Sequence, residues 1–308
     1  MAVQCGIVGL PNVGKSTLFN ALTRAGAASA NYPFCTIEPN TGVVDVPDKR
    51  LDRLAEIVHP ERILPAAQTF VDIAGLVRGA SKGEGLGNAF LANIRETDAI
   101  VQVVRCFEDD DVTHVEGGVN PERDLSIIDT ELIIKDLDAA EKALDRHRKA
   151  AKSGNKESII LAAILEKVAA ALDQGLWATK ANLYKEEMVA IKSFGFLTLK
   201  PMLLVGNISE ADIPDPAANP HYAHLIQAAA ERGCPVIPIC SKLEAEIQEL
   251  SPEERPLFLE EAGLAEPGLD QPHRRHRPPG RRRHPHGLRE GVHPSPGHCL
   301  RGFHPIQG

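Results

Sequence analysis

The stretch that decides the fold is Gly9–Ser16, which reads GLPNVGKS and matches the pattern G-x-x-x-x-G-K-[ST]. It lies between a short apolar run, residues 3–8, and a helical stretch, residues 15–25, which is the strand–loop–helix setting that the pattern requires. Glycines allow consecutive main-chain N–H groups to point at phosphates, and the helix N-terminus adds its positive end. A plain glycine-rich turn with a surface lysine is the alternative, but both flanking elements are present. The sequence therefore predicts a phosphate-binding loop.

Each residue type in this loop has an expected task. Lys15 would reach the β- and γ-phosphate oxygens and serve catalysis, and the Ser16 hydroxyl would bind Mg²⁺. The nucleotide-binding residues that we expect from this loop are Asn12, Val13, Gly14, Lys15, Ser16 and Thr17.

The rest of the chain alternates strand-like and helical stretches. Further apolar runs, rich in Val and Ile and stopped by Pro or Gly, occupy residues 41–47, 67–75, 99–107, 201–209 and 235–241. Continuous apolar runs are typical of strands that are buried on both faces of a parallel sheet. We therefore predict an α/β fold with a doubly wound, mainly parallel sheet.

A different kind of segment separates the fourth and fifth of these six strands. Two helical stretches, joined by KSGNKES, each carry apolar residues at a 4-3-4 spacing. We favour a projecting helical hairpin with a coiled-coil-like seam over two ordinary amphipathic helices on the sheet, because the segment interrupts the strand–helix rhythm. The predicted seam consists of Ile133, Leu137, Ala140, Leu144, Leu161, Leu165, Val168 and Leu172.

Two further sites are expected to sense the γ-phosphate and its metal ion. Asp72-Ile-Ala-Gly75 ends a predicted strand, so that Asp72 would hold Mg²⁺ through water and the Gly75 N–H would contact the γ-phosphate. Thr36, between the two loops, is the candidate for closing over Mg²⁺ when a triphosphate is bound, unless it is a plain loop threonine. The glycines between residues 75 and 87 predict a segment that is ordered by nucleotide or is simply flexible.

The base-reading loop points to adenine. Guanine-specific P-loop proteins carry N-K-x-D, whereas this chain has Asn207-Ile208-Ser-Glu210, with the carboxylate displaced by one methylene. A site that reads donors by hydrogen bonding loses its discrimination when that pairing is lost. We predict ATP over GTP, with Asn207, Ile208 and Glu210 near the base; the alternative is a tolerant guanine site that uses Glu210. Ser241 and Lys242 are candidates for backing the base.

Charge is divided unevenly along the 308 residues, whose formal net charge is −8. Residues 271–308 contain eight Arg, no Lys and one Glu, a net charge of +7, so the first 270 residues carry 26 basic and 41 acidic side chains, a net charge of −15. No apolar run approaches the ~18 residues of a membrane span. Six scattered cysteines and a start without a leader sequence predict a cytoplasmic protein without disulfides or a zinc site.

Several motifs together resemble one family. The loop GLPNVGKST, the run NYPFCTIEPNTGVV, the segment DIAGLVRGASKGEGLGN and the altered NISE occur in the order found in the YchF-type Obg-like ATPases. The resemblance covers residues 1–270. It implies a GTPase-like P-loop domain with a helical coiled-coil insertion, a preference for ATP, and association with the ribosome or its large subunit.

The resemblance also implies roles for individual residues. The family lacks the usual water-orienting Gln, and Leu76 stands at that place here; His114 matches the family's loop His and would position the attacking water. Asn12 matches an Asn that helps potassium-stimulated relatives bind a monovalent cation, so K⁺ is a candidate cofactor beside Mg²⁺. The alternative is that Asn12 only shapes the loop.

The expected domain organisation follows from these motifs. Residues 1–128 and 199–270 form the nucleotide-binding domain, residues 129–198 form the insertion, and residues 271–308 form an unstructured tail where the family has a β-rich TGS domain. We interpret the tail as an out-of-frame reading of a GC-rich gene; the alternative is an Arg/His arm that binds RNA phosphates.

The function expected from the sequence is that of a cytoplasmic, Mg²⁺-dependent ATP hydrolase that acts as a slow nucleotide switch, without a membrane or DNA partner. Two alternatives remain at this point. One is a GTPase of the same fold, and the other is a nucleotide-sensing module with negligible turnover, because Leu76 cannot orient water.

Overall fold

A six-stranded sheet is the centre of the structure, a computed structural model that describes residues 3–27, 40–73, 86–109, 111–112, 114–251 and 253–261. The strand order is β2-β3-β1-β4-β5-β6, and only β2, which pairs with β3, runs antiparallel to its neighbour. All six strands lie within the predicted apolar runs. Their bounds are β1 Val3–Val8, β2 Thr41–Asp45, β3 Ala67–Asp72, β4 Ala99–Arg105, β5 Met202–Asn207 and β6 Val236–Ile239.

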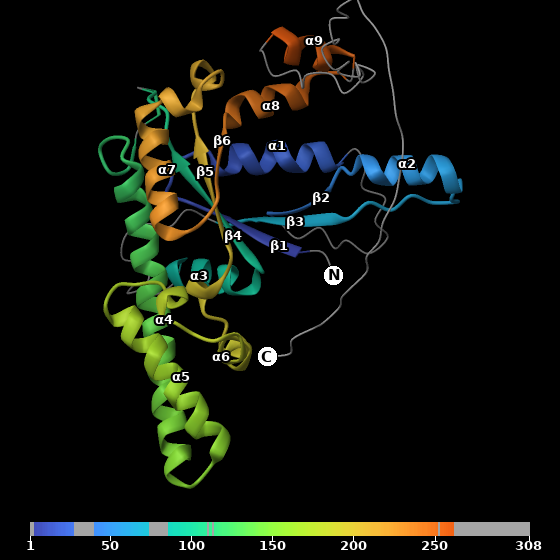
Figure 1. Cartoon of the computed structure of the whole chain (residues 1–308). Coiled ribbons are helices and arrows are strands. Elements are labelled where there is room, and N and C mark those ends of the chain that lie inside the picture. Colours follow the sequence, from blue (N-terminus) through green and yellow to red (C-terminus); the bar gives the residue numbers. More distant parts are fainter. Residues whose placement is uncertain are drawn as a thin grey trace, which may run out of the picture. The chain divides into compact units, whose positions relative to one another are not determined.

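Helices cover both faces of this sheet, so the predicted doubly wound α/β fold is confirmed. Figure 1 shows α1 and α8 together on one side of the strands and α3 on the other. The described helices are α1 Lys15–Ala27, α2 Lys49–Val58, α3 Leu86–Glu96, α4 Pro121–Lys152, α5 Lys156–Asp173, α6 Lys185–Ala190, α7 Pro220–Arg232, α8 Ser241–Glu249 and α9 Glu254–Glu261.

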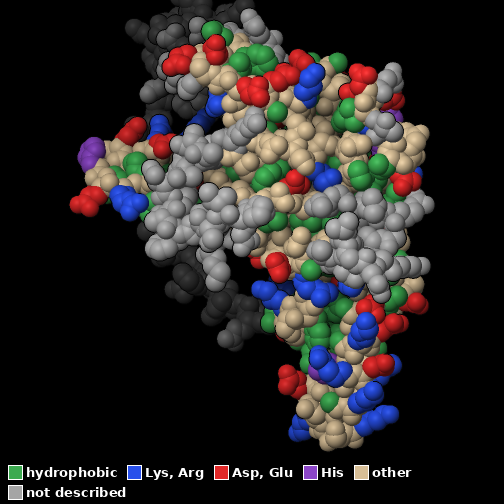
Figure 2. Space-filling model, turned by 180° about the vertical axis from the view of Figure 1, so that it is seen from behind, with side chains coloured by type: hydrophobic (Ala, Val, Ile, Leu, Met, Phe, Trp, Pro, Cys, Tyr) green, Lys and Arg blue, Asp and Glu red, His purple; other side chains and the backbone are tan. Residues whose placement is uncertain are grey.

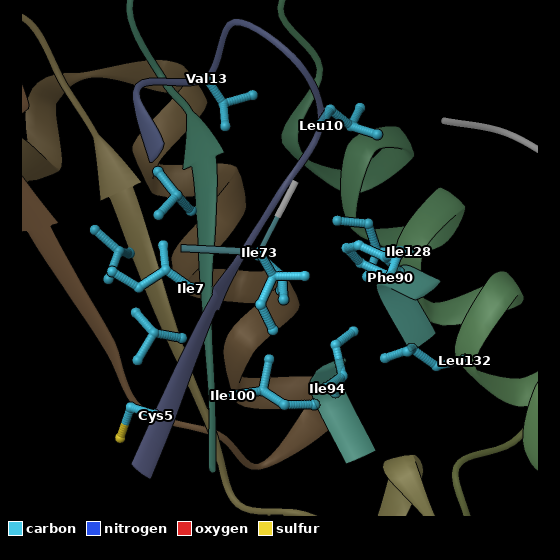
Figure 3. Packing of buried hydrophobic residues seen from close by; sticks show 14 of the residues in the cluster. Cys5, Ile7, Leu10, Val13, Ile73, Phe90, Ile94, Ile100, Ile128 and Leu132 are labelled. Carbon is cyan, nitrogen blue, oxygen red and sulfur yellow. The ribbon is translucent and has the colours of Figure 1, made fainter. Parts of the chain in front are cut away.

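The main hydrophobic core joins the central strands to α3 and the first half of α4. Ile7 and Ile100 come from neighbouring parallel strands, are fully buried and point to opposite faces of the sheet. Figure 3 shows Ile94 of α3 and Leu132 of α4 on the same side of the strands as Ile100. Removing such side chains from water stabilises the fold by about 1.5–3 kcal/mol for each one. This core holds the sheet rigid where its strands end, and those strand ends carry the predicted site.

The helical hairpin forms a second core of its own. All eight residues of the predicted seam belong to one cluster with Ala143, Ala162 and Ile164, so the seam is confirmed. Figure 1 shows α4 and α5 running away from the sheet. Asn155 accepts a hydrogen bond from the Ser158 N–H (2.9 Å) and so caps α5 at the turn.

The insertion does not begin with a new helix at residue 129. α4 begins eight residues earlier, because Asn120 caps it and Pro121 occupies its first turn, where a missing N–H costs nothing. Its first half packs in the sheet core, and its second half forms the hairpin. One continuous helix therefore joins the two bodies that the sequence separates at residue 129.

The C-terminal part of the chain is described only as far as Glu261. α9 ends there, and the predicted tail, residues 271–308, lies outside the described residues. None of the described helices combines the length and the apolar composition that a membrane-spanning segment requires.

Candidate nucleotide-binding site

Those predicted site residues that the structure describes gather at one edge of the sheet because four parallel strands end there. β1 leads into the phosphate loop, β3 ends at Asp72, the loop that follows β4 carries His114, and β5 ends at Asn207. Ligands of open α/β sheets bind outside the carboxyl ends of the strands.

The phosphate loop depends on two glycines. A Cβ atom on Gly9 would lie 2.6 Å from the Val103 carbonyl oxygen, and a Cβ atom on Gly14 would lie 2.3 Å from Asn207 Nδ2. Gly14 also has a φ of +94°, which disfavours any side chain. Asn12 takes the left-handed conformation (φ 62°), which Asn tolerates better than most residues.

Lys15 is held inside this loop. Its Nζ atom donates a hydrogen bond to the Leu10 carbonyl oxygen (2.9 Å), and the residue is only 7% exposed. Burial lowers the pKa of Lys15, and the negative charge of Asp72 opposes that shift. The ammonium group is therefore curled over the loop, where a bound phosphate would sit. Val13 packs in the main core, whereas Ser16 and Thr17 are exposed in the first turn of α1.

Ser16 and Asp72, 56 residues apart in sequence, meet in the structure. The Ser16 hydroxyl donates a hydrogen bond to Asp72 Oδ2 (2.9 Å), while Asp72 Oδ1 is buried and has no hydrogen-bond partner among the described residues. Among the described residues no group of three or more His, Cys, Asp or Glu could hold a metal ion. Mg²⁺ typically takes one or two protein oxygens and completes its shell with waters and phosphate oxygens. The hydroxyl and the unsatisfied carboxylate oxygen fit that donor set.

Asn207 joins the phosphate loop to the start of α8. Its Nδ2 atom donates to the Val13 carbonyl oxygen (3.0 Å), and its Oδ1 atom accepts from the Ser241 N–H (2.9 Å). Both ends of the amide are thus committed to main-chain groups. Ser241, which is 1% exposed, has a hydroxyl that finds no hydrogen-bond partner within the described part of the chain.

The other residues of the base-reading loop separate in the structure. Ile208 is 3% exposed and packs with Tyr222 and Leu225, so its side chain points into a hydrophobic cluster. Glu210 begins a short 3-10 helix, Glu210–Asp212, in which Ser209 donates to Asp212. Glu210 is therefore the carboxylate of this motif that remains for a base, and Ile208 supports the loop from the hydrophobic cluster.

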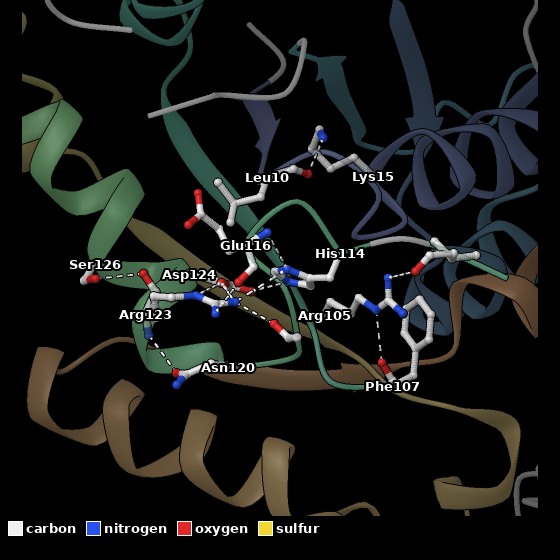
Figure 4. Close-up of polar contacts among 12 residues, drawn as sticks. Leu10, Lys15, Arg105, Phe107, His114, Glu116, Asn120, Arg123, Asp124 and Ser126 are labelled. Atoms are coloured by element: carbon white, nitrogen blue, oxygen red, sulfur yellow. Dashed lines mark hydrogen bonds and ion pairs between the residues drawn. The ribbon is translucent and has the colours of Figure 1, made fainter. Parts of the chain in front are cut away.

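His114 is buried in a polar network and does not lie free in its loop. Its Nε2 atom is 2.9 Å from Asp124 Oδ2, and its Nδ1 atom accepts a hydrogen bond from the Glu116 N–H (3.1 Å). The side chains of His114 and Asp124 are each 4% exposed. Figure 4 shows this network in one view with Leu10 and Lys15 of the phosphate loop.

Two arginines that sequence reasoning missed fold this loop. Arg105, 2% exposed, donates to the carbonyl oxygens of Phe107, Asp109 and Val112 and lies over the Phe107 ring. Arg123 donates to the carbonyl oxygens of Glu116 and Gly118. Their places at a strand end and in a helix's first turn were visible in the sequence, but their partners, the carbonyl oxygens of a loop, carry no sequence signal.

Three predicted residues cannot be placed. Thr36, Gly75 and Leu76 lie outside the described residues, so their predicted roles stay predictions.

The sheet order, the glycine loop with its buried lysine and the Ser16–Asp72 pair define a P-loop nucleotide-binding protein with a GTPase-type fold. A family model described as 50S ribosome-binding GTPase matches residues 4–163. The ribosome-binding ATPases YchF of Haemophilus influenzae and Bacillus subtilis are 56% and 51% identical over 271 residues, which cover 88% of this chain and 74% of each relative. This chain therefore belongs to the YchF family.

A solved structure agrees with this assignment. The Schizosaccharomyces pombe YchF GTPase superposes with a TM-score of 0.74 at 40% identity, and the match covers 85% of this chain and 71% of that one. The resemblance seen in the sequence motifs and the predicted fold class are both confirmed.

Proposed function

We propose that this chain is a cytoplasmic, Mg²⁺-dependent nucleotide switch that binds ATP and hydrolyses it slowly. The observation that carries the proposal is the phosphate end of the site, where Lys15 is buried in the loop and Ser16 meets Asp72. These residues arrive from two separate strand ends, and a structural turn would need neither the buried ammonium group nor the unsatisfied carboxylate oxygen.

Magnesium would be held by the Ser16 hydroxyl and, through water, by Asp72. A bound Mg²⁺ ion neutralises charge on the β- and γ-phosphates. Lys15 would orient the same phosphates. Equilibrium binding of ATP with Mg²⁺ and with EDTA tests this assignment, and we expect the Mg²⁺ form to bind at least tenfold more tightly. Equal affinity in the two conditions would show that ATP binding does not depend on Mg²⁺.

The proposed preference for ATP rests on the carboxylate of the base-reading loop. Guanine recognition needs a carboxylate that meets both N1–H and the 2-amino group, and Glu210 is one methylene longer than the usual Asp. Adenine presents no N1 proton, so a poorly placed carboxylate weakens the binding of ATP less than the binding of GTP. In a competition assay against a fluorescent ATP analogue we expect ATP to displace the probe at lower concentration than GTP. A tenfold preference for GTP would identify the chain as a GTPase of the same fold.

Slow hydrolysis is proposed because His114, the residue proposed to position water, is already bound to protein groups. Both of its ring nitrogens form hydrogen bonds within the protein, so His114 must leave this network to orient water. We expect His114→Ala to lower steady-state phosphate release in Mg²⁺ and K⁺ by tenfold or more while ATP affinity stays unchanged. The same burial favours the second candidate function, a sensor with negligible turnover, and phosphate release no faster than in buffer would select the sensor.

Ribosome association is proposed from the relatives, which are named ribosome-binding ATPases. The body of the chain is acidic, but residues 142–156 at the free end of the hairpin hold six basic side chains and one acidic one. Figure 2 shows Lys and Arg side chains gathered there. Lys156 begins α5, where a cation is unfavourable to the helix, so helix stability does not explain it.

Co-sedimentation with ribosomes tests this contact. A variant with Gln at Arg146, Lys149, Lys152 and Lys156 should lose most binding, whereas a variant with Gln at four distant exposed bases should keep it. Those control positions are Arg53, Arg62, Lys185 and Lys192. Equal loss in both variants would mean that overall charge, and not the hairpin, mediates the contact.

A further inference from the structure

The loop that follows β4 is fastened to the first turn of α4 by a single buried network. Its centre is the contact between His114 and Asp124, which lie ten residues apart and have side chains that are each 4% exposed. Arg123 closes the network on its solvent side with a side chain that is 29% exposed. Figure 4 shows how these three side chains converge.

The hydrogen bonds determine the proton arrangement on His114. Because the Glu116 N–H donates to Nδ1 (3.1 Å), Nδ1 acts as an acceptor. Nε2 then carries the proton in the neutral ring and donates it to Asp124 Oδ2 (2.9 Å). No ring nitrogen is left to hydrogen-bond to a water molecule, and the ring has almost no contact with solvent.

Both carboxylate oxygens of Asp124 also have hydrogen-bond partners. Oδ2 accepts from His114, and Oδ1 accepts from Arg123 Nε (3.1 Å) and Nη2 (2.9 Å). Arg123 also donates to the carbonyl oxygens of Glu116 (2.9 Å) and Gly118 (2.6 Å). His114 therefore cannot turn outward unless the His114–Asp124 contact breaks and the segment that Arg123 holds gives way.

The loop could be held in this conformation without the buried contact between His114 and Asp124. An acidic residue in the first turn of α4 is already favoured by the helix N-terminus, and the Arg123 contacts with carbonyl oxygens would hold the loop without a histidine. A buried imidazole must find a partner for each nitrogen, which an apolar side chain of similar size would not need. The loop also emerges beside the phosphate loop, because β4 is the parallel neighbour of β1.

We propose that Asp124 and Arg123 are positioning residues that form a latch, which stores His114 in a state unable to assist hydrolysis and so sets the basal rate. This inference rests on the proposed role of His114 in the function above. Turnover then depends on the fraction of molecules in which the latch is open. Breaking one charge-assisted hydrogen bond of the latch should raise a small open fraction about tenfold.

The test compares single-turnover ATP hydrolysis in Asp124→Ala, Arg123→Ala and the unaltered chain. We expect both variants to raise the rate constant several-fold, up to about tenfold, with unchanged affinity for ATP, because neither side chain belongs to the phosphate loop. Asp124→Asn should give a smaller rise, because its amide oxygen still accepts from Nε2–H. Adding His114→Ala to either variant should abolish the rise, which a merely structural role would not predict.

A matched control lies on the same helix. Asp129→Ala breaks another largely buried carboxylate–arginine pair, with Arg232 (2.8 Å), without touching His114, and it should leave the rate constant unchanged. If Asp124→Ala does not fold, Arg123→Ala decides the question, since its side chain is more exposed.

The outcomes separate the latch from the proposed function. If His114→Ala lowers turnover but both latch variants leave it unchanged or lower it, the latch is wrong and the function stands. If His114→Ala has no effect on turnover, the role of His114 fails and the latch fails with it. A rise that survives in the double variants would also overturn the latch.

Discussion

Asp72 and Asp124 are two carboxylates near the same edge of the sheet, and their oxygens are used in opposite ways. One oxygen of Asp72 accepts a hydrogen bond from Ser16, and the other has no partner in the part of the chain that the structure describes. Asp124 gives one oxygen to His114 and the other to Arg123. The proposed phosphate end of the site thus keeps one oxygen for a metal ion, whereas the residue proposed to position water has both ring nitrogens hydrogen-bonded to protein groups. We therefore expect this arrangement to bind nucleotide readily and to hydrolyse it slowly.

The largest expected effect comes from the phosphate end. Lys15→Ala should weaken ATP binding about 100-fold, because removing one partner of a buried, charge-assisted contact costs several kcal/mol. Isothermal titration calorimetry measures this, with the exposed Lys185→Ala as the charge-matched control. Loss of less than threefold would mean that the loop does not bind phosphates through this lysine.

Asp72→Asn should have the next largest effect, and only when metal is present. Replacing the carboxylate removes a charge that would face a bound Mg²⁺ ion, so the affinity for ATP in Mg²⁺ should fall at least tenfold, while the affinity in EDTA should not change. The same titration with and without Mg²⁺ tests both halves. An equal fall in the two conditions would make Asp72 a structural partner of Ser16 alone.

Glu210→Asp should shift base preference without changing the phosphate end. Moving the carboxylate back by one methylene brings it nearer to the place that guanine recognition requires, and we expect the ratio of GTP to ATP affinity to rise about tenfold. Competition binding measures the ratio, and the exposed Glu231→Asp provides the control. A ratio that does not move would show that Glu210 does not face the base.

The smallest expected effect concerns a monovalent cation. Replacing K⁺ by Na⁺ should slow turnover about threefold, since such an ion stabilises less charge than an arginine finger does. Asn12→Gly keeps the left-handed backbone available while it removes the side chain, and it should abolish the difference between the two salts. If Asn12→Gly still turns over faster in K⁺ than in Na⁺, the Asn12 side chain does not bind the cation and only shapes the loop.

The sequence predicted those parts of the molecule that local pattern determines. The six strands, the phosphate loop and the hairpin seam follow from short-range apolar periodicity and from glycine spacing. The start of α4 could also have been predicted, because Asn120-Pro121 is a helix-start signal that the apolar spacing overshadowed.

The remaining features depend on tertiary contacts that no spacing encodes. Asn207 fits a base-reading motif, yet its amide also joins the Val13 carbonyl oxygen to the Ser241 N–H, and Ile208 points into a hydrophobic cluster. His114 was expected to position water from a loop, and its burial depends on Arg105 and Arg123, which donate hydrogen bonds to carbonyl oxygens of that loop. Every residue has a main-chain carbonyl oxygen, so the sequence does not show which carbonyl oxygens an arginine will contact.

The most direct test of the contrast between the two carboxylates is a single-turnover experiment with protein in excess over radiolabelled ATP and Mg²⁺. Filter retention reports bound nucleotide, and phosphate release reports hydrolysis, from the same mixture. We predict that ATP is retained within seconds and is then hydrolysed with a rate constant of about 10⁻³ s⁻¹ or less, as in P-loop switches without a supplied catalytic group. Hydrolysis as fast as binding, or no retention of ATP, would contradict the account.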